Sequence, residues 1–186
     1  MGRTWSMPLL CVLAVLGLGA CDSTPEPPPG TVSTQSGWAR VAYPEGWSVV
    51  PESAVPSGWD WAAQPASGAD ASAQIAVDGD FSRHRDLEIS ASSLLAGAQI
   101  GGLPGFSLLG SEPVDVHGAT EAKRFRFIYR PEGAEYEGVW WVAKAEDDRT
   151  IAVQLTGRKP LSDSLADQTL AGLGISAKHP DEGSRA

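Results

Sequence analysis

The segment 120–130 carries the clearest alternation of apolar and polar positions in the chain. Phe125, Phe127 and Tyr129 recur at every second position, and the residues between them are mostly polar. Successive side chains of a β-strand point to opposite faces of the sheet. The alternation therefore predicts a strand that buries its aromatic face.

Further strands are predicted before and after this segment. The turn sequence Pro-Glu-Gly occurs twice, and each time it follows a short extended pattern. Residues 39–50 are expected to form a hairpin around the first of these turns. The remaining strand candidates are, in chain order, 59–62, 74–77, 106–116, 136–145 and 150–156.

Two segments have helical rather than extended spacing. The first is expected to end by Gly101-Gly102, with Pro104 beyond as a stop signal. The second is expected near 161–172, after Pro160. The apolar stripe of the first helix consists of Leu87, Ala91, Leu94, Leu95 and Ala98.

The order of these elements predicts an α+β fold, in which helices pack on a mainly antiparallel sheet. Trp140 and Trp141 are adjacent in one predicted strand and must point to opposite faces. Both faces of that strand are therefore expected to be covered, with a helix layer on each side. This arrangement is an α/β/α sandwich.

Residues 1–20 have the features of a secretory signal peptide. Arg3 precedes an apolar stretch from Pro8 to Leu18, and small residues follow. The stretch is about 11 residues long, short of the roughly 20 that a transmembrane helix needs. Leu18-Gly19-Ala20-Cys21 also has the pattern of a bacterial lipobox. We expect Cys21 to become the first mature residue and to carry diacylglycerol and palmitate. An ordinary signal peptide with a coincidental cysteine is the alternative.

The rest of the chain divides into three parts. Residues 21–37 are expected to be a lipidated cysteine followed by a disordered tether, because the segment is rich in proline and polar residues. Residues 38–178 are expected to form a single domain, and 179–186 a polar tail. Cleavage before Cys21 would remove Cys11 and leave no free thiol for catalysis or metal binding.

The charge balance restricts the partners. The chain of 186 residues has 14 Lys and Arg against 23 Asp and Glu, a formal net charge of −9. Such a surface lacks the basic footprint that nucleic acid requires. It would also be repelled by anionic lipid head groups, so we expect acyl chains rather than surface charge to hold the protein on the membrane.

The motifs of enzymes and metal sites are missing from the sequence. There is no nucleophile elbow, Walker motif or paired-histidine zinc motif, so no catalytic residue, metal or cofactor is predicted. His117 is expected to be an exposed turn residue.

Two surfaces remain as candidates for ligand contact. Arg124, Arg126 and Arg130 form a basic stripe, for which ion pairing with Glu135 and Glu137 is the ordinary explanation. Trp59 and Trp61 would share a strand face beside a loop and could line an apolar cleft.

The turn Tyr43-Pro44-Glu45-Gly46-Trp47, the strand Phe125–Tyr129 and the segment Val139–Val142 together resemble actinobacterial lipoproteins of the LpqN/LpqT kind. The resemblance covers most of residues 38–176 and implies a PsbP-like α/β/α sandwich. It implies no catalytic residues, and it implies a binding or accessory protein of the cell envelope.

The expected function is therefore non-catalytic. We expect a lipid-anchored protein on the extracytoplasmic face of the cell membrane, which binds an envelope protein or a lipid-like ligand. The alternatives are an envelope hydrolase with an unrecognised site and a purely structural accessory subunit. A pocket holding titratable groups with strongly shifted pKa values would favour the hydrolase.

Overall fold

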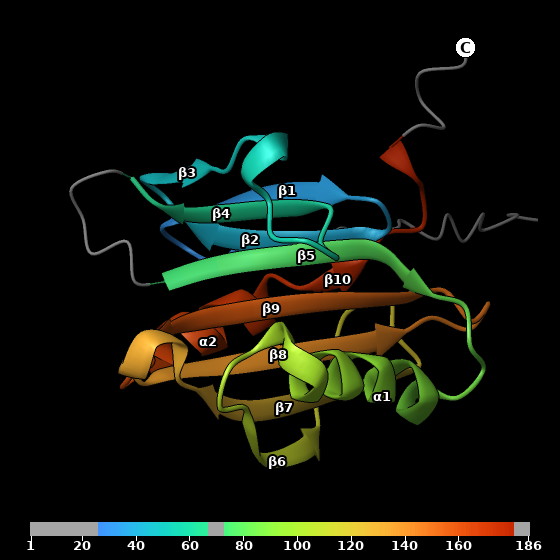
Figure 1. The fold of residues 1–186 in the computed structure, drawn as a ribbon. Helices are drawn as coiled ribbons and strands as arrows, with labels where there is room; N and C mark the ends of the chain where they lie inside the picture. Colours follow the sequence, from blue (N-terminus) through green and yellow to red (C-terminus); the bar gives the residue numbers. More distant parts are fainter. Residues whose placement is uncertain (1–25, 67–72, 181–186) are drawn as a thin grey trace, which may run out of the picture.

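The structure, a computed structural model, describes residues 26–66 and 73–180 and contains two antiparallel sheets (Figure 1). The smaller sheet has the strand order β1-β2-β10, and the larger has the order β3-β4-β5-β9-β8-β7-β6. The strands are β1 (Thr31–Ser36), β2 (Ala39–Pro44), β3 (Trp47–Val49), β4 (Trp61–Pro65), β5 (Ala73–Ser82), β6 (Ser107–Pro113), β7 (Glu121–Tyr129), β8 (Tyr136–Lys144), β9 (Thr150–Arg158) and β10 (Gly174–Ile175).

Two α-helices accompany the sheets, α1 (Leu87–Gly97) and α2 (Asp163–Ala171). A π-helical turn, Ala98–Gly102, extends α1, and short 3-10 helices occupy Glu52–Ala54 and Pro131–Gly133. Both predicted helices are confirmed, and so is the antiparallel meander from β6 to β9.

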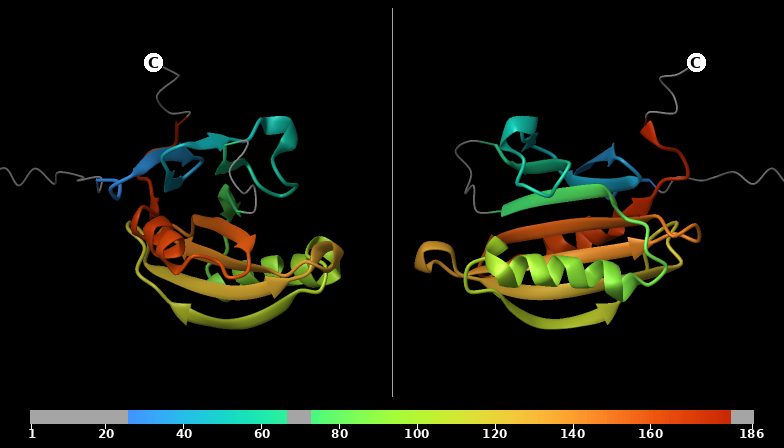
Figure 2. Two further views of the ribbon diagram at one scale, coloured as in Figure 1. Left: turned by 90° about the vertical axis from the view of Figure 1, so that its left-hand side faces the viewer. Right: turned by 45° about the vertical axis from the view of Figure 1, so that its right-hand side comes forward.

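The tryptophan pair at the centre of β8 confirms the prediction of two covered faces. Trp140 packs with Leu87 and Ala91 of α1, whereas Trp141 packs on the opposite side with Ala166 of α2. Figure 2 shows the two helices on opposite sides of the large sheet. The small sheet shares the α2 side, since Val41 of β2 belongs to the same apolar cluster as Trp141.

Each helix begins at a side chain that caps it. The Asp86 carboxylate accepts a hydrogen bond from the Glu88 N–H at 2.8 Å, and the Ser162 hydroxyl accepts one from the Leu165 N–H at 3.2 Å. Such caps satisfy backbone donors that the first turn of a helix leaves without partners. Both helices are therefore fixed in place by local sequence as well as by packing.

The expected tether and domain boundary are wrong in part. Residues 31–36 form β1, which pairs along its whole length with β2, from Thr31 opposite Pro44 to Ser36 opposite Ala39. Only Thr31 of this strand is buried. The strand is held by backbone hydrogen bonds and β-branched residues rather than by apolar burial, and for this reason composition alone suggested a tether. Residues 1–25, which include the predicted signal peptide and Cys21, lie outside the described residues.

The expected hairpin over residues 39–50 is also wrong. Pro44-Glu45-Gly46 does form a turn, in which Gly46 has a φ of 82° and the Glu45 N–H donates to the Gly30 carbonyl at 2.9 Å. The strands on either side of the turn join different sheets, because β2 pairs with β1 and β10 whereas β3 pairs with β4. A turn sequence predicts a change of direction but does not predict which strand becomes the partner.

A pair of glycines joins the two sheets. Gly37, in the turn between β1 and β2, has a φ of 52°, and a Cβ there would lie 2.8 Å from the backbone carbon of Gly79 in β5. The neighbouring Trp38 N–H donates to the Gly79 carbonyl at 3.0 Å. This close approach needs residues without side chains on both strands. It places the β1–β2 turn of the small sheet against β5 of the large sheet.

Candidate functional site

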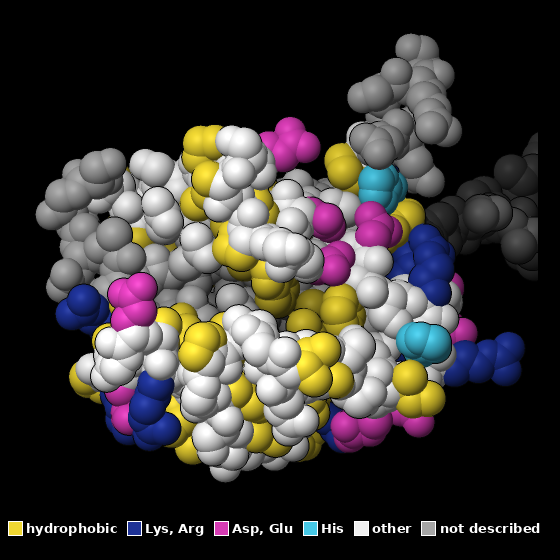
Figure 3. All heavy atoms as spheres, in the orientation of Figure 1, with side chains coloured by type: hydrophobic (Ala, Val, Ile, Leu, Met, Phe, Trp, Pro, Cys, Tyr) yellow, Lys and Arg dark blue, Asp and Glu magenta, His cyan; other side chains and the backbone are white. Residues whose placement is uncertain are grey.

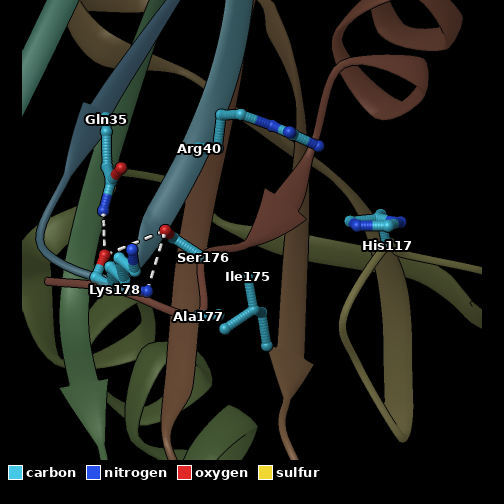
Figure 4. A pocket seen from close by; sticks show the side chains of 7 residues that line it. All are labelled: Gln35, Arg40, His117, Ile175, Ser176, Ala177 and Lys178. Atoms are coloured by element: carbon cyan, nitrogen blue, oxygen red, sulfur yellow. Dashed lines mark hydrogen bonds between the residues drawn. The ribbon is translucent and has the colours of Figure 1, made fainter. Parts of the chain in front are cut away.

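Four residues from separate parts of the chain form a line across the small sheet. Gln35 of β1 lies opposite Arg40 of β2, Arg40 lies opposite Gly174 of β10, and Gly174 forms a parallel bridge with His117. We call this line the Arg40 row. Figure 4 shows the Arg40 side chain extending along the sheet toward the side on which His117 lies.

The glycine in the Arg40 row lets the Arg40 side chain pass closely over β10. A Cβ on Gly174 would lie 2.9 Å from Arg40 Nη2 and 3.4 Å from the His117 Cβ. The guanidinium and His117 therefore both lie next to Gly174, and the guanidinium takes the space that a side chain there would need. A pocket of about 380 Å³ occupies this region, and we call it the Arg40 pocket. Its lining consists of Gln35, Arg40 and His117 from the Arg40 row, together with Ile175, Ser176, Ala177 and Lys178 (Figure 4).

Hydrogen bonds fix the rim of the Arg40 pocket. The Gln35 side-chain amide donates to the Lys178 carbonyl at 2.6 Å and to the Gly37 carbonyl at 3.0 Å. The Ser176 hydroxyl donates to the same Lys178 carbonyl at 2.9 Å, and the Ser176 N–H donates to the Trp38 carbonyl at 2.8 Å. The chain after β10 is thus tied back onto the β1–β2 turn, and it encloses one side of the pocket.

The residues after β10 correct the boundary between domain and tail. The His179 ring packs edge-on against Trp38, with ring centroids 4.9 Å apart, and its Nε2 lies 3.3 Å from Asp80 Oδ2. The Arg149 guanidinium lies over the same Trp38 ring at 3.9 Å. His179 therefore belongs to the folded domain rather than to the predicted tail 179–186. Residues 181–186 lie outside the described residues.

The Arg40 pocket contains positive charge that no counterion among the described residues offsets. Arg40 is half-buried, and within the described residues its guanidinium has neither an ion pair nor a hydrogen-bond acceptor. Burial lowers the pKa of Arg40 from its usual value, since loss of water disfavours the charged form. Lys178 adds a second cation, and none of the described residues that line the pocket is a carboxylate.

The predicted arginine stripe differs from Arg40, because all three of its arginines form ion pairs. Arg124 contacts Glu112 at 2.5 Å, Arg126 contacts Asp163 at 3.3 Å, and Arg130 contacts Glu135 at 2.9 Å. The expected pairing with Glu135 is confirmed for Arg130, while the other two arginines use partners on β6 and α2. Lys159 and Arg130 together lower the pKa of Glu135. These contacts make the stripe an ion-paired surface.

The predicted apolar surface of Trp59 and Trp61 is not formed. Trp61 packs in the cluster that contains Tyr43, and their ring centroids are 5.2 Å apart. Trp59 packs against two other clusters, one of them around Val50 and Ala62. Strand β4 begins only at Trp61, so strand alternation does not extend to Trp59 and the two rings do not share a face.

Acidic side chains gather on the face where β5 meets the β1–β2 turn (Figure 3). Burial and the charge of Asp60 raise the pKa of Asp78 to about 6, although the Asp80 N–H donates to its Oδ1 at 3.2 Å. No group of three or more histidine, cysteine, aspartate or glutamate side chains in the described part of the chain is arranged to hold a metal ion. The raised pKa of Asp78 therefore bears on the stability of the fold rather than on metal binding.

We expect Asp78→Asn to stabilise the protein near neutral pH. The pKa of Asp78 is higher in the folded than in the unfolded state, so stability falls as pH rises from about 4 to about 6. The neutral amide avoids this loss, which amounts to about 1–2 kcal/mol once partial exposure to water is allowed for. Urea unfolding should show the gain near neutrality and almost none at about pH 4. The exposed Asp115→Asn is the control, and an equal gain at both pH values would contradict the explanation.

Sequence reasoning missed Arg40 and Lys178 and placed His117 in an exposed turn. His117 is indeed exposed, but its bridge to Gly174 makes it part of the pocket. No local pattern identifies the pocket, because its lining comes from the β1–β2 hairpin, from His117 and from residues 175–178, which are far apart in the sequence. Only the registers of β1, β2 and β10 bring them together.

Solved structures of other proteins share the fold of this chain. The chain aligns with the solution structure of cyanobacterial PsbP (CyanoP) from Synechocystis with a TM-score of 0.56 and 14% identity, over 85% of this chain and 98% of that one. The chain has the PsbP-like fold. The same fold relates it to the crystal structure of LpqN of Mycobacterium tuberculosis, described as involved in cell envelope biogenesis. That alignment has a TM-score of 0.51 and 16% identity, over 78% of this chain and 90% of that one.

Comparisons of the sequence alone identify no further similar protein. The chain matches no sequence-family model and no curated protein. The PsbP-like fold confirms the predicted architecture, whereas the resemblance to LpqT-type lipoproteins remains a prediction. Across residues 26–66 and 73–180, no helix has the length and apolar character needed to cross a membrane.

Proposed function

We propose that this protein is a non-catalytic accessory module of the cell envelope, anchored by lipid at Cys21 and facing away from the cytoplasm. The lipobox sequence at Leu18-Gly19-Ala20-Cys21 supports the anchor. The PsbP-like fold, shared with a protein described as involved in cell envelope biogenesis, supports the accessory role. The module would bind a component of the envelope rather than transform it.

The Arg40 pocket is the observation that carries the binding role. An unpaired, half-buried guanidinium costs solvation that no counterion within the described residues offsets. Such a cation is typical of sites that are completed by a ligand. The pocket presents charge and hydrogen-bond donors, while the described residues of its lining include no carboxylate beside His117.

The position of β1 determines how far the domain could stand from the membrane. With Cys21 anchored, about ten residues separate the lipid from the start of β1 at Thr31. A fully extended chain of that length spans at most about 35 Å. The acidic domain would thus stay close to the bilayer, and two or more acyl chains would be needed to hold it there.

Loss of the thiol at Cys21 should abolish lipidation. In a bacterial host that makes lipoproteins, we expect the wild-type chain to incorporate labelled palmitate and to enter the detergent phase on phase separation. Cys21→Ala should lose the label, while Cys11→Ala, which alters the only other cysteine, should keep it. Retention of label by Cys21→Ala, or its loss from Cys11→Ala, would contradict the proposed anchor.

A further inference from the structure

The Arg40 pocket has the donors that recognise an oxyanion. The guanidinium of Arg40 offers a planar set of N–H donors, which matches two oxygens of a carboxylate or phosphate at once. His117 lies on the other side of Gly174 and can donate from its ring. Arg40 extends from β2 across β10, and His117 lies beyond β10 (Figure 4).

The remainder of the pocket is suited to the uncharged part of a ligand. Ile175 and Ala177 contribute apolar lining, and Lys178 lies on the opposite rim, where its side chain is exposed. A volume of about 380 Å³ is within the usual range for small-molecule sites and exceeds that of a single phosphate or carboxylate group. The ligand would therefore carry an organic group beside its anionic one.

We propose that the Arg40 pocket binds the oxyanion group, phosphate or carboxylate, of a small envelope ligand. This inference rests on the proposed function, because it names the chemistry of the ligand that the accessory module binds. Arg40 and His117 hold the anionic oxygens, and Lys178 attracts the anion from the rim. The net charge of −9 repels anionic surfaces, so a concave local site favours a small ligand over a whole membrane surface.

Anion binding in the Arg40 pocket depends on the absence of a side chain at Gly174. A Cβ there would lie 2.9 Å from Arg40 Nη2, which is too close, so the guanidinium would have to shift. The anion would then lose the donor position that Arg40 offers beside His117. Gly174→Ala should therefore weaken anion binding even though both donors remain.

Calorimetry on the mature chain, purified in a neutral detergent, tests the proposal with inorganic phosphate and with acetate as probes, at constant ionic strength. We expect saturable binding of at least one probe that Arg40→Gln weakens about tenfold or more, as loss of a charged hydrogen bond does. Lys178→Gln should weaken it less than about fivefold, since that charge is exposed. Arg158→Gln, at the far end of β9, is the matched control and should change nothing.

Three results would overturn the proposal. The first is absence of saturable heat for both probes, and the second is equal weakening by Arg40→Gln and Arg158→Gln. The third is Arg40-dependent binding to phosphatidylglycerol vesicles without binding of either probe, which would assign the cation to a membrane surface. Palmitate labelling at Cys21 does not depend on the pocket. A failure of the calorimetry would therefore not contradict the lipid anchor, and a failure of the labelling would not contradict the anion site.

Discussion

Phe127→Ala is expected to destabilise the domain by about 3–5 kcal/mol, the usual cost of emptying a buried aromatic site. The Phe127 side chain is 0% exposed and lies at the centre of the α1-side cluster. Its ring centroid is 4.1 Å from that of Trp140 and 5.6 Å from that of Phe106. Neither neighbour can fill the space without leaving its own contacts, so the loss would be a large share of the stability of a small domain.

The denaturant midpoint of Phe127→Ala is best compared with that of Arg126→Ala on the same strand. Arg126 lies on the opposite face and forms one exposed ion pair with Asp163, so its truncation should cost less than about 1 kcal/mol. Similar midpoints for the two variants would show that the faces of β7 are assigned the wrong way round.

Gly138→Ala is expected to destabilise the domain by about 1–3 kcal/mol through overpacking. Gly138 of β8 pairs directly with Phe127 of β7, and the Phe127 ring lies over the glycine. A Cβ on Gly138 would overlap three atoms of that ring. The ring would have to leave its contact with Trp140, or the two strands would have to separate.

A double-mutant cycle isolates this effect. In a Phe127→Leu background the smaller side chain leaves room, so Gly138→Ala should cost at least about 1 kcal/mol less than in the wild type. Thermal and urea unfolding of the four proteins provides the measurement. If the two substitutions were additive, the glycine would be required by something other than the Phe127 ring.

The sequence predicted the elements whose pattern is local. Phe125 and Phe127 mark the buried face of β7, and the stripe that includes Leu87 and Ala91 marks α1, because period and burial coincide in those segments. The adjacent pair Trp140 and Trp141 even predicted the two layers around the large sheet. In each case the information lies within about ten consecutive residues.

The sequence did not predict features that depend on which strands pair. β1 contains one buried residue, and its stability comes from its pairing with β2 across the turn at Gly37 and Trp38, which a composition argument does not include. The Arg40 pocket depends on the register of Gln35, Arg40 and Gly174, and on a glycine whose importance is visible only beside its neighbours.

The ion pairing expected for the arginine stripe is confirmed at Arg130 and Glu135, whereas the surroundings of the other residues of the two candidate surfaces were not predicted. Arg124 and Arg126 find carboxylates on β6 and α2, elements whose positions could not be derived from the strand itself. Trp59 lies before the start of β4, so the rule of alternation was applied beyond the end of the strand. In both cases the residue types were interpreted correctly, whereas their surroundings were not.

Mass spectrometry of the mature protein, purified from the membranes of a lipoprotein-producing bacterium, tests the central claim most directly. We expect an N-terminal peptide that begins at Cys21 and carries the added mass of diacylglycerol, with palmitate among its acyl chains. A mature chain that begins at another residue, or one that begins at Cys21 without acyl groups, would contradict it.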